Sequence, residues 1–196
     1  MTAFSTRCCR RPDLLGAVLA IWLGIAAAVA AVGAQAQGID VKRPTLTVEG
    51  DGLVLDAQFD IALTPTVEET LNKGVPLYFL LEFELIRPRW YWFNERVAGF
   101  QQQYRLSFNA LTRQYRLGVG NLHQSFGSLS EALDVMRRIH RRVDGEPGSL
   151  RRGDSFNAAL RLRLDTSQLP KPFQLNALGS REWHMSSDWY RWTLSL

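Results

Sequence analysis

Two glutamates on one predicted strand are the clearest candidates for acid–base chemistry in this sequence of 196 residues. Glu82 and Glu84 are separated by one residue, so on a strand their side chains leave the same face with Cα atoms about 7 Å apart. Glycoside hydrolases use two carboxyl groups about 5 to 9.5 Å apart across a cleft. The same spacing arises on a solvated sheet face where acids pair with arginines such as Arg105 or Arg116. The second interpretation is favoured, because so short a chain leaves little room for a sugar-binding groove.

Metal-binding and nucleophilic patterns are absent from the sequence. The three histidines, His123, His140 and His184, have no ligand-like spacing, and the two cysteines stand at positions 8 and 9. Zinc sites use close pairs of histidine or cysteine. Ser128 lacks the flanking glycines of a nucleophile elbow and suits a helix cap. We therefore expect no cofactor, no metal site and no catalytic residues, and we expect that the protein is not an enzyme.

Aromatic and arginine residues form the most informative groups. Residues 90–93 are four consecutive aromatics, and a second group follows at 189–192. Neighbouring side chains on an extended segment point to opposite faces, so a single core buries only part of each group. The two interpretations are a second core in which arginines stack on the rings and a recognition surface. The candidate binding residues are Arg89, Trp90, Tyr91, Trp92, Trp189, Arg191 and Trp192.

A basic cluster ends the most convincing predicted helix. It consists of Arg137, Arg138, Arg141 and Arg142. Cations at that end of a helix complement the helix dipole, and such runs are usually solvated. The alternative is peripheral contact with an anionic membrane, since basic side chains near such a surface are attracted to lipid headgroups.

The N-terminal residues have the order of a secretion signal. Arg7, Arg10 and Arg11 precede the apolar residues 14–32, and an Ala-Gln-Ala site ends at Ala36. A positive region, an apolar region and small residues at the cleavage site indicate export. We expect cleavage after Ala36 and release into the periplasm. The alternative is that residues 14–32 remain as an inner-membrane anchor with the domain facing the periplasm.

The chain that follows is expected to be one domain, 37–196, without cysteine. Outside residues 1–36 it keeps 20 basic and 18 acidic residues, so the whole-chain net charge of +4 overstates its basic character. Nothing in this balance indicates nucleic acid as a partner. A chain of this length can bury a core without disulfides.

Alternation of apolar and polar residues predicts most of the elements. Period two indicates strands with one buried face, and short turns between them indicate antiparallel pairing. Thr64 as N-cap and Pro65 at the first helical position open a short helix, and a capping box at Ser128 opens an amphipathic helix over 129–142. We expect a mainly β (α+β) fold: an antiparallel β-sandwich or curved sheet of about seven strands with one amphipathic helix and one or two short helices. The predicted strands are 45–49, 53–63, 77–86, 103–108, 114–119, 156–164 and 183–196.

Several of these segments resemble segments of a known protein family. The segments are GVPLYF at 74–79, WYW at 90–92, YRLS at 104–107, QYRL at 114–117 and the closing tryptophan-rich strand. The chain resembles a proteobacterial exported family, the domain of unknown function numbered 4390. The resemblance covers essentially all of residues 37–196. It implies export and a single domain, and it implies no activity.

Three functions follow from these patterns. The first is a non-catalytic exported interaction domain that binds an envelope or sensor protein through the aromatic and arginine residues. The second is a carrier or binding module for an apolar ligand, held in a cavity between the sheet and the 129–142 helix. The third and least favoured is a small hydrolase that uses Glu82 and Glu84. The patterns do not indicate the oligomeric state.

Overall fold

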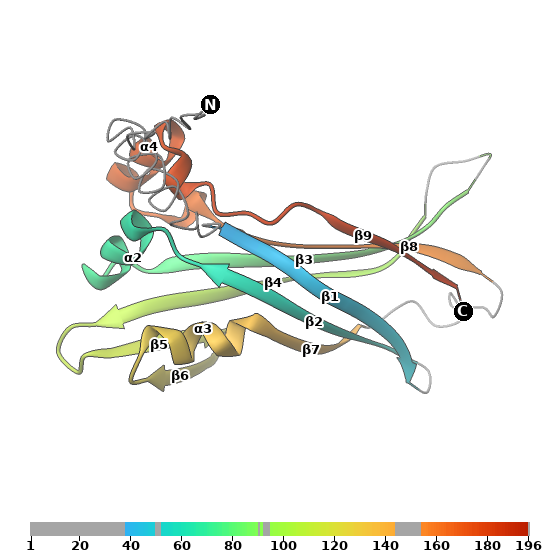
Figure 1. The fold of residues 1–196 in the computed structure, drawn as a ribbon, viewed down its shortest axis with the longest axis horizontal. Helices are drawn as coiled ribbons and strands as arrows, with labels where there is room; N and C mark the ends of the chain where they lie inside the picture. The colour runs from blue at the N-terminus through green and yellow to red at the C-terminus, as the bar shows by residue number, and fades with distance from the viewer. Residues whose placement is uncertain (1–37, 50–51, 90, 92–94, 144–153, 196) are drawn as a thin grey trace, which may run out of the picture. The chain divides into compact units, whose positions relative to one another are not determined.

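The computed structural model describes residues 38–49, 52–89, 91, 95–143 and 154–195. The chain divides into two units, Met1–Ala36 and Gln37–Leu196, and all described residues belong to the second. In that unit nine described strands form two antiparallel sheets, as the alternating sequence predicts (Figure 1). One sheet has three strands and the other has six.

The three-stranded sheet has the order β1-β2-β7. Its strands are β1 (Gly38–Glu49), β2 (Gly52–Ala62) and β7 (Arg138–Val143). Leu53, Leu55 and Phe59 of β2 are buried, and from Asp56 to Asp60 polar residues alternate with buried apolar ones. This alternation leaves one face of the sheet for the core and one for solvent.

The six-stranded sheet has the order β6-β5-β4-β3-β8-β9. Its strands are β6 (Leu122–Phe126), β5 (Gln114–Val119), β4 (Glu95–Asn109), β3 (Leu77–Arg87), β8 (Ser155–Leu164) and β9 (Tyr190–Ser195). The strongly apolar strand β3 lies inside the sheet between β4 and β8, as its hydrophobicity predicts.

The core lies between the inner faces of the two sheets. Phe79, Phe83 and Phe156 are fully buried from the six-stranded side, and Leu55 and Ile61 from the three-stranded side. They belong to one continuous cluster, and β1 contacts β8 while β7 contacts β4. Each such side chain contributes roughly 1.5–3 kcal/mol by leaving water. The packing of the inner faces leaves the outer face of each sheet for other roles.

Three described α-helices accompany the sheets, and their starts follow local rules. They are α2 (Pro65–Asn72), α3 (Leu129–Arg137) and α4 (Lys171–Gly179). Thr64 accepts a hydrogen bond from the Val67 backbone N–H, and Ser128 accepts one from Glu131. Both contacts are the N-caps that the sequence predicts. None of the described helices has both the length and the apolar character needed to cross a bilayer.

The helix predicted over 129–142 is too long. It ends at Arg137, and β7 begins at the next residue. Ile139 and Val143 are buried, and β7 pairs with β2 from Gln58↔Arg138 to Leu53↔Val143. Four-residue spacing of apolar residues fits a helix, but two-residue alternation through Arg141 also fits a strand. Pairing with β2 decides between them.

Other boundaries also differ from the prediction. The first strand, predicted over 45–49, begins earlier: β1 starts at Gly38. The closing strand predicted over 183–196 is shorter, because a 3-10 helix, η2 (Arg181–Trp183), and an irregular segment precede β9. A further 3-10 helix, η1 (Thr166–Gln168), and α4 follow β8, between the predicted strands 156–164 and 183–196.

Candidate functional site

The outer face of the six-stranded sheet carries a group of charged side chains in register. Glu82 of β3 lies opposite Arg161 of β8 on one side and Gln101 of β4 on the other. The neighbours of Glu82 along β3, Leu81 and Phe83, point into the core. Alternation along each strand therefore places the charged residues on the face away from the core.

Glu82 is the centre of this group. Its Oε2 atom accepts hydrogen bonds from Arg161 Nε at 2.9 Å, Arg161 Nη2 at 2.6 Å and Arg163 Nε at 3.1 Å. Its Oε1 atom accepts one from Gln101 Nε2 at 3.4 Å. Glu82 is only 8% exposed. Two guanidinium groups share one carboxylate, so the cluster has an excess of positive charge.

The ring of Trp189 packs against the guanidinium group of Arg161. The Arg161 guanidinium carbon lies 4.4 Å from the centre of the Trp189 ring, a distance at which the ring attracts the cation. The chain before Trp189 is tied to β8 at Ser187, which donates its N–H to the Leu162 carbonyl and accepts from the Leu162 N–H. Arg161 is thus held on both sides, by an aromatic ring and by a carboxylate.

Two further arginines extend the charged surface. Arg96 Nη1 lies 4.0 Å from Glu84 Oε1, and its side chain passes over Gly99. A Cβ atom at Gly99 would lie 2.6 Å from Arg96 Nη2, so a larger residue there would displace the arginine. Arg105 lies over the Tyr78 ring at 5.9 Å. We call the set the arginine face: Tyr78, Glu82, Glu84, Arg96, Arg105, Arg161, Arg163 and Trp189.

The arginines that contact the paired carboxylates are not the ones expected from the sequence. Glu82 contacts Arg161 and Arg163, and Glu84 contacts Arg96, in place of Arg105 and Arg116. The expectation of a sheet face with acid–arginine pairs agrees with this geometry. The three hydrogen bonds from Arg161 and Arg163 to Glu82 favour that interpretation over acid–base catalysis, because this carboxylate is already held by two cations.

The described members of the predicted group at 189–192 do not lie on one face of the sheet. Trp189 joins the arginine face, whereas Trp192 lies toward the core, with its ring 6.3 Å from that of Phe83. Arg191 is exposed on β9, opposite Ala159. Strand alternation explains this split, because Trp192 follows Arg191 by one residue.

The other predicted group lies at the end of β3. Arg89 forms an ion pair with Glu95, and Tyr91 is 67% exposed. Trp90, Trp92 and Phe93 lie outside the described residues. The expectation that Trp90 or Trp92 is exposed therefore stays a prediction.

The four arginines of the basic cluster do not point the same way, because Arg137 ends α3 and the other three lie on strand β7. Arg137 donates to Asp134 and to the Ile61 carbonyl, and Arg141 donates to Gln102 and covers the Phe100 ring at 4.4 Å. Arg138 and Arg142 are exposed on the outer face of the three-stranded sheet. The four arginines thus do not share one surface, although their contact with a membrane stays a prediction.

The space proposed for an apolar ligand is occupied by side chains. Ala132, Leu133 and Met136 of α3 are buried, and α3 contacts β2. These residues fill the position in which the carrier hypothesis placed its ligand. The described residues between α3 and the sheet therefore give no support to the carrier hypothesis.

The role of Arg161 and Arg163 was missed by sequence reasoning, although a signal was present. The two arginines are separated by one residue, as are Glu82 and Glu84, and both pairs alternate with apolar residues. Matching spacings on two strands indicate charge pairing only if the strands are neighbours in register. The sequence does not provide that register.

Comparison with known proteins identifies a family for this chain, and that family is described without an activity. No curated protein and no solved structure matches this chain. The family described as Domain of unknown function (DUF4390) matches residues 36–193, which include every strand of both sheets except the last residues of β9. The chain therefore belongs to the DUF4390 family.

Proposed function

We propose that this protein is a non-catalytic binding domain that is exported to the periplasm and contacts an envelope or sensor protein through the arginine face. The observation that carries the proposal is the pair of arginines that share Glu82, one of them stacked on Trp189. Tryptophan and arginine dominate the energetically important positions of protein interfaces. An arginine that is already ordered also loses less side-chain entropy on binding.

The partner surface is expected to be acidic. The arginine face has four arginines and two glutamates, so its charge is complementary to a surface rich in Asp and Glu. Such complementarity raises the association rate and makes it dependent on salt. Binding should therefore weaken as ionic strength increases.

Charge reversal at exposed positions of the arginine face tests the proposal. Arg96→Glu and Arg105→Glu change residues that do not hold Glu82, so the fold should be retained. The matched control is Arg113→Glu, in the exposed turn between β4 and β5. Each protein is expressed in cells, crosslinked in the envelope and purified, and the captured partners are compared by mass spectrometry.

The expected result is that wild type and Arg113→Glu capture the same partner, whereas Arg96→Glu and Arg105→Glu lose it. Melting curves establish that all four proteins are folded. Equal capture by all four folded proteins would show that the arginine face is not the binding surface.

A further inference from the structure

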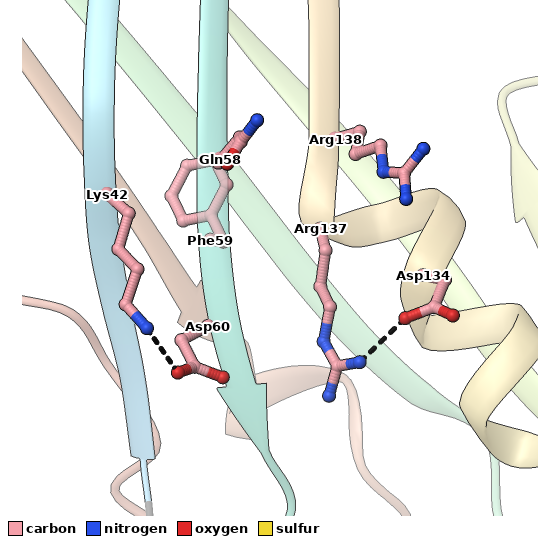
Figure 2. Close-up of a pocket in the computed structure, with 7 residues that line it drawn as sticks. All are labelled: Lys42, Gln58, Phe59, Asp60, Asp134, Arg137 and Arg138. Atoms are coloured by element: carbon pink, nitrogen blue, oxygen red, sulfur yellow. Dashed lines mark hydrogen bonds and ion pairs between the residues drawn. The ribbon is translucent and has the colours of Figure 1, made fainter.

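The outer face of the three-stranded sheet has two adjoining hollows. One has a volume of about 490 Å³, and its lining includes Lys42, Gln58, Asp60, Asp134, Arg137 and Arg138 (Figure 2). The other has a volume of about 360 Å³, and its lining includes Arg43, Thr45, Asp56, Gln58, Arg138 and His140. Gln58 and Arg138 line both hollows.

Strand register explains why these residues meet. Lys42 of β1 lies opposite Gln58 of β2, which lies opposite Arg138 of β7. Figure 2 shows Lys42 on β1, Gln58 on β2 and Arg138 at the start of β7. The next row on the same face pairs Thr45 with Asp56. Polar side chains from all three strands therefore line the hollows.

The three acids that line the hollows, Asp56, Asp60 and Asp134, all have partners. Lys42 Nζ lies 2.6 Å from Asp60, Arg137 Nη1 lies 2.6 Å from Asp134, and both contacts are drawn in Figure 2. In the smaller hollow His140 Nδ1 lies 2.6 Å from Asp56. Among the described residues, Arg43 and Arg138 have no carboxylate within ion-pair distance. The lining of the smaller hollow therefore includes two arginines that form no ion pair with a described carboxylate, beside Asp56, which is paired with His140.

The backbone places Arg43 in this hollow by a distortion. Consecutive residues of a regular strand point to opposite faces, so Arg43 would face the core if Lys42 faces outward. The pairing of β1 with β2 shifts between Lys42 and Thr45, which marks a β-bulge, and Arg43 has φ 48°. Bulges re-aim side chains, and a positive φ is strained for a residue other than glycine. The strained position of Arg43 is what brings its cation to the outer face.

We propose that the smaller hollow binds a phosphate group, held between the guanidinium groups of Arg43 and Arg138, with Thr45 and Gln58 as neutral donors. Arginine presents its donors in a planar fork that matches phosphate oxygens. A volume of about 360 Å³ accommodates a phosphate with a small organic group attached. The phosphate belongs either to a soluble phosphorylated compound or to a phospholipid headgroup. This site is on the other sheet from the arginine face and does not depend on the proposed function.

The sharpest test replaces Arg43 with glycine. Arg43→Gly removes the cation and relieves the strained φ, so this variant should bind phosphate less well while melting at the same temperature as wild type or higher. Arg113→Gly is the matched control, because Arg113 also has a positive φ, 52°, and lies in the turn between β4 and β5. Arg138→Gln removes the second cation without a change in backbone strain.

Binding of inorganic phosphate and of glycerol phosphate to the purified full chain is measured by calorimetry. Co-sedimentation with phosphatidylglycerol vesicles, compared with phosphatidylcholine vesicles, forms the second arm. Loss of one charge-assisted contact should weaken binding about tenfold or more in Arg43→Gly and Arg138→Gln, and leave Arg113→Gly as wild type. Comparison between variants cancels any contribution of residues 1–36 to vesicle binding.

The two arms identify the source of the phosphate. Dependence on Arg43 in the soluble arm indicates a phosphorylated compound, and dependence only with phosphatidylglycerol indicates a headgroup. Either result supports the site. If Arg43→Gly and Arg138→Gln bind as wild type does in both arms, or if wild type binds in neither, the site does not exist.

Discussion

At the scale of single residues, Glu82 shows how a carboxylate with the spacing of a catalytic pair serves a different purpose. It is nearly buried and bridges two arginines of β8, whereas Glu84 lies half-buried beside Arg96. A buried carboxylate with several charged donors organises its neighbours, because its removal leaves their charges uncompensated. Because the two glutamates share one strand face but differ in burial and in ion pairing, the effects of their substitution on stability can be compared directly.

Glu82→Gln should destabilise the domain by about 2 kcal/mol, because two arginines then lose their shared anion. Glu84→Gln should change stability by no more than about 0.5 kcal/mol, because its single ion pair is long and exposed. Urea denaturation of the two variants measures both values. Equal midpoints for the two variants would contradict the central role of Glu82.

His140 provides a prediction of pH dependence. A hydrogen bond with Asp56, and then the charge of Asp56, raise the pKa of the exposed His140 above its usual value. A raised pKa in the folded state means that the pair stabilises the fold below the unfolded pKa of about 6.5. That contribution is lost as pH rises through the higher folded pKa.

Asp56→Asn should therefore lower the pKa of His140, and the variant should be less stable than wild type in mild acid but similar at pH values above the folded-state pKa of His140. An NMR titration of the His140 ring gives the pKa, and thermal melts at several pH values give the stability. A His140 titration that is the same in wild type and Asp56→Asn would rule out the ion pair.

At the scale of elements, the start of α3 depends on a cap from a neighbouring residue, whereas its end depends on the pairing of β7 with the distant strand β2. Ser128 accepts from the Glu131 N–H at 3.3 Å, and Glu131 Oε2 accepts from the Gly127 N–H at 3.2 Å. The returning contact reaches one residue earlier than in the usual capping box, which uses the N-cap N–H. The end of α3 at Arg137 has no such local signal, since β7 follows directly.

Ser128→Ala should cost about 1 kcal/mol of stability, because it removes the acceptor for the Glu131 N–H. Ser125→Ala, at an exposed position of β6, is the control and should be close to neutral. Chemical denaturation measures both, and partner capture should be unaffected. A Ser128→Ala midpoint equal to that of the control would show that the cap does not stabilise α3.

At the scale of the whole molecule, the two packed sheets leave two outer faces with different chemistry. The six-stranded sheet presents the arginine face, and the three-stranded sheet presents the smaller hollow, for which we propose phosphate binding. Both surfaces are built on strands, which hold side chains more rigidly than loops do. A rigid scaffold with charged faces is consistent with the proposed binding function.

The predicted export signal leads to a prediction for the whole chain. The Ala-Gln-Ala site ending at Ala36 predicts that the protein isolated from the envelope begins at Gln37. Intact mass spectrometry of that protein determines its first residue. A species that retains Met1 and resists extraction by salt would mean that residues 14–32 remain as an anchor.

The sequence by itself determined the features that depend on near neighbours along the chain. Alternation identified the inward residues of β2, β3 and β8, because period two is a property of any extended segment. Thr64 and Ser128 marked helix starts, since a cap bonds to a residue three positions away. The mainly β class and the resemblance to the DUF4390 family follow from the same local patterns.

Tertiary structure decided what depends on residues that are distant in the chain. Residues 138–143 fit both a helix and a strand, and only pairing with β2 made them a strand. The partners of Glu82 are separated from it by 79 and 81 residues, so they depend on the pairing of β3 with β8. The outward position of Arg43 depends on a bulge whose register is set by β2. In each case the deciding interaction is a hydrogen bond or ion pair between strands, which a local pattern does not contain.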